Sequence, residues 1–216
     1  MTKVILTRHG EVEGINPPRF RGRREIPLTA LGRKQASAVA VRIAATNCDR
    51  ISAIYTSPLG RCVHTGAAIA DACDREGSTL PSLLDLDYGA WEWRSYEEMR
   101  REEPELFERW FETPQLMRFP NGESLQELVA RGADVLRTVI ARHPGGTVVL
   151  VGHASINRAI LLQVLDQPLS AYWRLEPLPC SISEFELAEG HPVLLRYNDI
   201  SHLSRIIPET TTDATD

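Results

Sequence analysis

The sequence lacks the features of a membrane or secreted protein. No apolar run approaches the roughly 18 residues that a membrane helix needs, and the first residues lack the basic-then-apolar layout of a signal peptide. The four cysteines are scattered and form no CxxC pair, which argues against a disulfide framework or a zinc site. We therefore expect a cytoplasmic protein with reduced thiols and no membrane partner.

An excess of positive charge is also missing. The 216 residues include 24 Lys and Arg against 29 Asp and Glu, a formal net charge of −5. The whole molecule therefore repels polyanions, which argues against nucleic acid as the main partner and requires any anion site to be local. Four arginines do gather at residues 19–24, although a solvated surface explains such a cluster equally well.

Short apolar stretches alternate with segments of helical spacing. The apolar runs predict strands at 4–8, 51–55 and 147–151, and the helical spacing predicts helices at 30–45, 60–73 and 156–165. Further helices are expected at 96–112 and 124–143, and further strands at 80–88, 181–187 and 192–197. Because strands joined through helices run parallel, this order predicts an α/β protein with a mainly parallel sheet.

The length favours one domain. We expect it to occupy residues 1–207, with a helical cap at about 96–143 over the edge of the sheet. The polar, acidic stretch at 208–216 has no periodicity and is expected to be a disordered tail.

Polar side chains follow three of the predicted strands. Arg8 and His9 come at the end of the first, Arg61 begins the helix after the second, and His153 follows 147–151. The carboxyl ends of parallel strands share one edge of the sheet, where α/β proteins hold their ligands. Guanidinium groups match phosphate oxygens, and cationic neighbours keep an imidazole neutral, so His9 is a candidate nucleophile toward phosphorus.

Carboxylates and aromatic residues occupy the next stretch. Alternation over 80–88 places Asp85 and Asp87 on one face of the expected strand. Trp91, Trp93 and Tyr96 follow; they wall a pocket or belong to the core, and the core is the commoner role.

Motifs in a fixed order across about residues 3–203 carry a resemblance to a known family. They are Thr7-Arg8-His9-Gly10-Glu11, Asn16, residues 22–29, Gly32, Gln35-Ala36, Ser57-Pro58-Leu59 with Arg61 and Thr65, Gly89-Ala90-Trp91-Glu92, Gly122-Glu123-Ser124 and Val151-Gly152-His153. In these motifs the chain resembles the histidine phosphatase family, also called the phosphoglycerate mutase-like family. The match is specific for the family and much less so for the substrate.

The resemblance implies a three-layer α/β/α sandwich with a mostly parallel central sheet and helices on both faces. It implies that His9 attacks the phosphoryl group while Arg8, Arg61 and His153 hold its oxygens. Asn16 matches a position that helps to orient the phosphate pocket. No metal or other cofactor is required by such a mechanism.

The remaining site residues are assigned by position in the same motifs. Arg21, Gly22 and Trp91 are expected to line the substrate pocket. Asp85 is expected to donate the proton to the leaving oxygen, with Asp87 and Glu92 as alternatives. The family usually has glutamate at the position of Asp85, and aspartate has a shorter reach.

The expected function is that of a metal-independent phosphatase, which hydrolyses a small phosphorylated metabolite through a phosphohistidine on His9. Broad-specificity phosphatases and α-ribazole phosphatases are equally similar. The alternatives are a phosphoglycerate-type mutase and a catalytically weak protein that binds phosphorylated ligands. A metallohydrolase with His9, His153 and Asp85 as ligands is disfavoured, because Arg8 and Arg61 would repel a cation. The oligomeric state is open, and a homodimer is one expectation.

Overall fold

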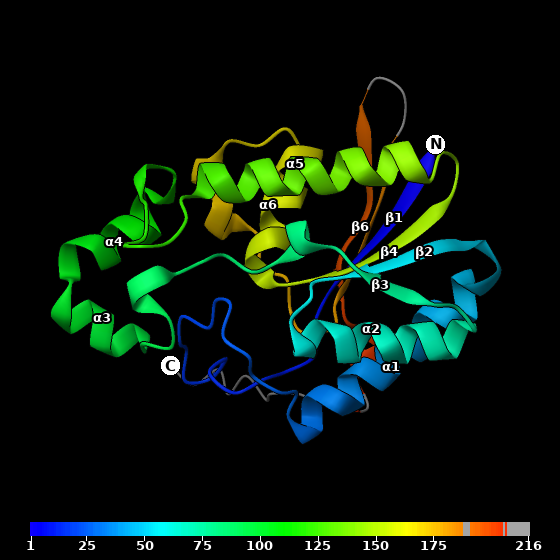
Figure 1. Cartoon of the computed structure of the whole chain (residues 1–216), viewed down its shortest axis with the longest axis horizontal. Coiled ribbons are helices and arrows are strands. Elements are labelled where there is room, and N and C mark those ends of the chain that lie inside the picture. Colours follow the sequence, from blue (N-terminus) through cyan, green and yellow to red (C-terminus); the bar gives the residue numbers. More distant parts are fainter. Residues whose placement is uncertain (188–190, 205, 207–216) are drawn as a thin grey trace, which may run out of the picture.

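A six-stranded sheet with helices on both faces forms the centre of the molecule (Figure 1). The computed structural model describes residues 1–187, 191–204 and 206, so the tail expected at 208–216 lies outside the described residues. The strands are β1 (Thr2–Arg8), β2 (Ile51–Thr56), β3 (Gly77–Thr79), β4 (Thr147–Gly152), β5 (Ile182–Leu187) and β6 (Pro192–Asp199). The helices are α1 (Ala30–Asn47), α2 (Gly60–Cys73), α3 (Tyr96–Glu102), α4 (Pro104–Glu112), α5 (Leu125–Arg142) and α6 (Ala154–Val164).

The strand order is β3-β2-β4-β1-β5-β6. Strand β4 pairs in parallel with both β1 and β2, and β3 is parallel to β2. Strand β5 is antiparallel to β1 and to β6, so it alone reverses the common direction. The mostly parallel sheet inferred from the sequence is therefore confirmed.

Two apolar layers cover the two faces of the sheet. Figure 1 shows α5 and α6 on one face and α1 and α2 on the other. Alternate residues of β1 enter different layers: Val4 and Leu6 pack with α5 and α6, whereas Ile5 packs with α1 and α2. Strand β4 is buried along its whole length because both of its faces are covered.

The helix ends follow local signals. The Thr29 side chain accepts a hydrogen bond from the backbone N–H of Gly32 and caps α1, as expected. Ser124 and Glu127 form a capping box at the start of α5. Among the described residues, no helix combines the length and the apolar character needed to cross a lipid bilayer.

The single helix expected over 96–112 is wrong. The chain forms α3 and α4 instead, with Glu103 between them in a non-helical conformation. Pro104 is the first residue of α4, where its missing N–H costs nothing, but it cannot continue the helix before it. Figure 1 shows α3 and α4 at one end of the molecule, whereas α5 lies along the sheet.

The strand expected over 80–88 is also wrong. The sheet ends with β3 at Gly77–Thr79, a 3-10 turn follows at Pro81–Leu83, and residues 84–88 belong to no strand. The guanidinium of Arg131, on α5, donates hydrogen bonds to the carbonyls of Ser82, Leu84 and Asp85. A side chain thus supplies the partners that a neighbouring strand would have supplied.

Candidate active site

The ends of β1 and β4 bring two histidines together. The backbone N–H of His9 donates to the carbonyl of Gly152 at 3.1 Å, extending the parallel pairing of the two strands. His153 follows Gly152 directly and precedes α6. The two imidazole centroids lie 5.1 Å apart in an edge-to-face arrangement.

The His9 ring is oriented by its own loop. Its Nδ1 lies 2.7 Å from the carbonyl oxygen of Gly10, so Nδ1 carries the proton and donates it. Nε2 has no hydrogen-bond partner within the described part of the chain and keeps its lone pair. The side chain is only 1% exposed, and burial together with the charge of Arg61 holds its pKa well below the usual value.

Close backbone packing fixes Gly10. A Cβ at Gly10 would lie 2.3 Å from the carbonyl oxygen of Gly32, so the loop after β1 requires glycine there. The Gly10 N–H donates to the Thr65 hydroxyl, which in turn donates to the carbonyl of Arg61. The carbonyl that orients His9 is therefore held by α1 and α2 together.

Arg61 is wholly buried and every nitrogen of its guanidinium is bonded. Nε donates to Nδ1 of His153 at 3.2 Å, Nη1 to the carbonyl of Arg24, and Nη2 to the carbonyl of Gly22. Nη2 also lies 3.4 Å from Oδ2 of Asp85. The arginine on the first turn of α2 thus joins the loop after β1 to the second histidine and the carboxylate.

His153 has the opposite tautomer to His9. Because Nδ1 accepts from Arg61, the proton lies on Nε2, which donates to the hydroxyl of Ser57 at 2.8 Å. The Cys62 thiol lies 3.4 Å from the same Nε2. Burial and the neighbouring arginines hold the pKa of His153 well below the usual value.

Arg8 is a buried cation that keeps a hydrogen-bond donor unpaired within the described part of the chain. It is 6% exposed, and its Nη1 donates to the carbonyl of Pro177 at 3.0 Å. Its Nε is buried and has no partner within the described residues. Burial, with the charges of Arg21 and Arg158, lowers the pKa of Arg8 to about 9.

Asp85 is the carboxylate that meets this cluster. Its Oδ1 accepts from the Leu86 N–H at 2.9 Å and from the hydroxyl of Ser155, and its Oδ2 lies 3.7 Å from Nδ1 of His153. It is buried although it lies in no strand.

The two alternatives to Asp85 are bonded elsewhere. Asp87 pairs with the guanidinium of Arg23 at 3.1 Å. Glu92 accepts from the Arg23 backbone N–H at 2.6 Å, and burial raises its pKa.

The other expected site residues do not all join the cluster. The Gly22 carbonyl meets Arg61, and Arg21 is tied to the carbonyl of Gly14. Asn16 is exposed and has no hydrogen bond with a described residue, so its phosphate-binding role stays a prediction.

The structure does not place Trp91 in the substrate pocket, where it was expected. Its side chain is 0% exposed, it packs against Phe20 and Phe119, and its indole N–H donates to Glu103. A ring enclosed on all sides belongs to the core. The core was the commoner of the two roles considered for the aromatic residues in this stretch.

Two hydroxyls that hold the site in place had no role assigned from the sequence: Ser57, which lies in one of the family motifs, and Ser155, which lies in none. Ser57 follows β2 directly, and Ser155 lies in the first turn of α6. Each sits where a strand gives way to a helix, which is the one local signal that could have pointed to them. Their partners, His153 and Asp85, are distant in sequence and could not be foreseen.

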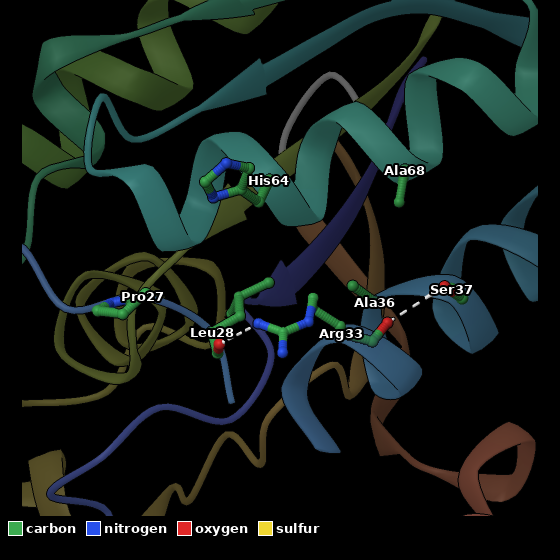
Figure 2. A pocket seen from close by; sticks show the side chains of 7 residues that line it. All are labelled: Pro27, Leu28, Arg33, Ala36, Ser37, His64 and Ala68. Carbon is green, nitrogen blue, oxygen red and sulfur yellow. Dashed lines mark hydrogen bonds between the residues drawn. The ribbon is translucent and has the colours of Figure 1, made fainter. Parts of the chain in front are cut away.

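A separate cavity of about 360 Å³ lies between α1 and α2 (Figure 2). His64 and Ala68 line one side and Arg33 the other, and the Arg33 guanidinium is bonded to the carbonyl of Leu28. None of the clustered residues lines this cavity. The described side chains include no group of three or more His, Cys, Asp or Glu placed to hold a metal ion.

Comparisons with known proteins agree in both sequence and fold. A family model for the histidine phosphatase superfamily (branch 1) matches residues 4–200. The chain is 34% identical over 209 residues to phosphoserine phosphatase 1 of Hydrogenobacter thermophilus, covering 97% of this chain and 98% of that one. It is 34% identical over 212 residues to a probable phosphoglycerate mutase GpmB of Proteus mirabilis, covering 95% and 97%.

A solved structure shows the same likeness. A mutant phosphoserine phosphatase of Entamoeba histolytica in complex with phosphoserine superposes with a TM-score of 0.83 and 28% identity, covering 94% of this chain and 100% of that one.

Proposed function

This chain belongs to the histidine phosphatase superfamily, and on that premise we propose that His9 takes the phosphoryl group of a small phosphomonoester and then yields it to water. The activity is that of a phosphoric monoester hydrolase. One observation carries the assignment of the nucleophile: Nε2 of a buried, neutral His9 is unpartnered among the described residues, while Nδ1 is fixed by the Gly10 carbonyl.

In the first step the Nε2 lone pair of His9 attacks phosphorus and the bond to the ester oxygen breaks. Arg8 offers its unpaired Nε to the phosphoryl oxygens, and the charges of Arg8 and Arg61 offset the negative charge of the transferred group. Asp85 donates the proton that the leaving alkoxide needs. The contacts of its Oδ2 with Arg61 and His153 favour Asp85 over Asp87 and Glu92.

In the second step water attacks the phosphohistidine. The Asp85 carboxylate accepts the proton of the water, the N–P bond breaks, and inorganic phosphate leaves while His9 regains its lone pair. Because guanidinium groups supply the positive charge, no step requires a metal ion, and hydrolysis is expected to persist in a chelator.

Phosphoserine is the first substrate to test. A 34% identical relative is named a phosphoserine phosphatase, and the Entamoeba neighbour is described in complex with phosphoserine. The likeness to a probable phosphoglycerate mutase supports a second candidate, transfer of the phosphoryl group between hydroxyls of one ligand. Incubation with 3-phosphoglycerate separates the two, since a phosphatase releases inorganic phosphate and a mutase forms the 2-phospho isomer.

Substitution of His9 tests the central proposal. We expect His9→Ala to reduce hydrolysis of p-nitrophenyl phosphate by at least about 10³-fold, because the nucleophile is lost. His64→Ala, which changes an exposed histidine of α2, is the matched control and should stay within about twofold. Quenching wild-type protein during turnover, without acid, should leave phosphate on the peptide that contains His9.

Two results would contradict this proposal. Turnover retained by a folded His9→Ala protein would exclude covalent catalysis through that ring, and phosphate found on another peptide would move the nucleophile.

A further inference from the structure

Arg158 lies beside the site and is absent from the chemistry described above. It is one helical turn after Ser155 on α6, and Ser155 bonds to Asp85, so both side chains share one face of the helix. Its Nε donates to the carbonyl of Leu175 at 2.5 Å. Its guanidinium stacks 5.1 Å from the ring centroid of Tyr172 and 4.7 Å from that of Trp173.

The segment that holds Arg158 also holds Arg8. Arg8 donates to the carbonyl of Pro177, two residues after Leu175. Two guanidinium groups are therefore anchored on neighbouring carbonyls of one short segment. Their mutual repulsion contributes to the lowered pKa of Arg8.

The site holds more positive charge than a phosphate can balance. Three cations are Arg8, Arg61 and Arg158, and the fourth is Arg21, whose charge acts on Arg8 although its side chain is bonded to the Gly14 carbonyl. Within the described chain Asp85 is the only carboxylate within 4.0 Å of any of them. Four positive charges leave three if Asp85 is ionised, and all four remain when Asp85 is protonated, as the first step requires. A phosphate group carries at most about two negative charges, so at least one positive charge remains for another anionic group.

Free hydrogen-bond donors remain as well. The Arg158 hydrogen bond to a carbonyl uses Nε, and its guanidinium also lies against the side chain of Tyr172, where a hydrogen bond from Arg158 favours the ionised form of the phenol. The hydroxyl of Tyr172, whose side chain is 1% exposed, is buried and its proton has no acceptor among the described residues. A buried hydroxyl proton without an acceptor is costly, and a bound ligand oxygen would satisfy it.

We propose that Arg158, assisted by Tyr172, binds a carboxylate on the part of the substrate that leaves with the ester oxygen. The enzyme then selects phosphomonoesters of hydroxy acids and hydroxy amino acids over those of amino alcohols, simple alcohols and phenols. A planar guanidinium matches a carboxylate through two parallel hydrogen bonds. This inference rests on the proposed phosphatase activity and names the substrate class for the same site.

Phosphoserine and phosphoethanolamine form the test pair. They share the phosphate and the ammonium group and differ by the carboxylate alone. We expect wild-type kcat/KM to be about 10- to 100-fold higher for phosphoserine, the range for one charge-assisted interaction. In Arg158→Gln this preference should fall to about twofold, with kcat/KM for phosphoethanolamine and p-nitrophenyl phosphate nearly unchanged.

Two further variants keep the test decisive. Arg100→Gln removes another arginine that stacks on an aromatic ring, that of Phe107, and should leave the preference intact. Tyr172→Phe deletes the hydroxyl alone and should lower the preference about three- to tenfold, even if Arg158→Gln proves poorly folded.

The outcomes distinguish this inference from the proposed function. If Arg158→Gln slows all three substrates equally, the residue only supports Arg8 and the carboxylate site is excluded. If wild-type protein hydrolyses p-nitrophenyl phosphate but treats phosphoserine and phosphoethanolamine alike, the inference fails and the phosphatase stands. If no phosphomonoester is hydrolysed, the proposed function itself fails.

Discussion

A single neighbouring atom sets the protonation of each imidazole in the site. The Gly10 carbonyl places the His9 proton on Nδ1, and the Arg61 Nε–H places the His153 proton on Nε2. Burial among arginines keeps both rings neutral, which a nucleophile requires and an ordinary surface histidine does not guarantee. The two rings are therefore chemically different although both follow a strand of one sheet.

The leaving group reveals the role of Asp85. The side chain in Asp85→Asn cannot donate a proton, so the rate of hydrolysis should fall most for substrates with basic leaving oxygens. We expect kcat to fall by about 10²- to 10³-fold for phosphoserine and by less than about tenfold for p-nitrophenyl phosphate, in steady-state assays of both. Asp87→Asn, which removes the partner of Arg23, is the control. If Asp85→Asn slowed both substrates equally, Asp85 would not be the proton donor. If Asp87→Asn slowed phosphoserine more than p-nitrophenyl phosphate, the proton donor would be Asp87.

At the level of elements, the sequence predicted what local patterns specify. The helix at 60–73 and the apolar β4 were found because their signals lie within the elements themselves. The alternation over 80–88 predicted a strand that is absent, because Arg131, about 50 residues later, bonds the carbonyls there. Pro104 is a local signal in the sequence for the break between α3 and α4. Asp85 lies beside His153 and Arg61, as its position in the family motif implied, although the strand that was expected to carry it does not form.

Arg131 is expected to matter for both stability and rate. Arg131→Gln should lower the free energy of unfolding by about 2–4 kcal/mol, because several backbone carbonyls lose charged donors. It should also reproduce the leaving-group pattern of Asp85→Asn in weaker form, since the Asp85 carbonyl is one of its acceptors. Urea unfolding and the two-substrate assay measure these effects.

Arg142→Gln, at the exposed end of the same helix, is the matched control and should change stability by less than about 0.5 kcal/mol. An Arg131→Gln protein with wild-type stability and rates would show that segment 82–85 holds its conformation without the guanidinium.

For the molecule as a whole, the two buried histidines link stability to pH. Their pKa values are lowered on folding, so below about pH 6.5 the unfolded chain takes up protons that the folded chain does not. Stability is therefore complete above pH 6.5 and falls as the pH falls toward the lowered values. The slope reaches up to about 1.4 kcal/mol per pH unit for each ring and about 2.8 kcal/mol per pH unit for the two rings together.

Urea unfolding at pH 7.5, 6.5 and 5.5 measures this slope. The carboxyls of Glu127 and Asp199, whose pKa is lowered to about 2, keep their stabilising effect over this range and lose it only as the pH falls below about 4. The half-buried His202 also has a pKa lowered by burial and adds to the slope in this range. His9→Asn should therefore remove up to about 1.4 kcal/mol per pH unit of the slope between pH 6.5 and 5.5. A wild-type protein equally stable at both values would show that the rings accept protons without unfolding.

The pairing of β1 with β4 has one more consequence. Neighbouring strands in any sheet lie about 4.8 Å apart, and the two imidazoles at the ends of this pair are 5.1 Å apart. The spacing of the paired strands therefore sets the distance between the nucleophile His9 and the second histidine, His153. Substitutions in the surrounding helices and loops that leave this pairing intact should therefore leave the spacing of the two histidines unchanged.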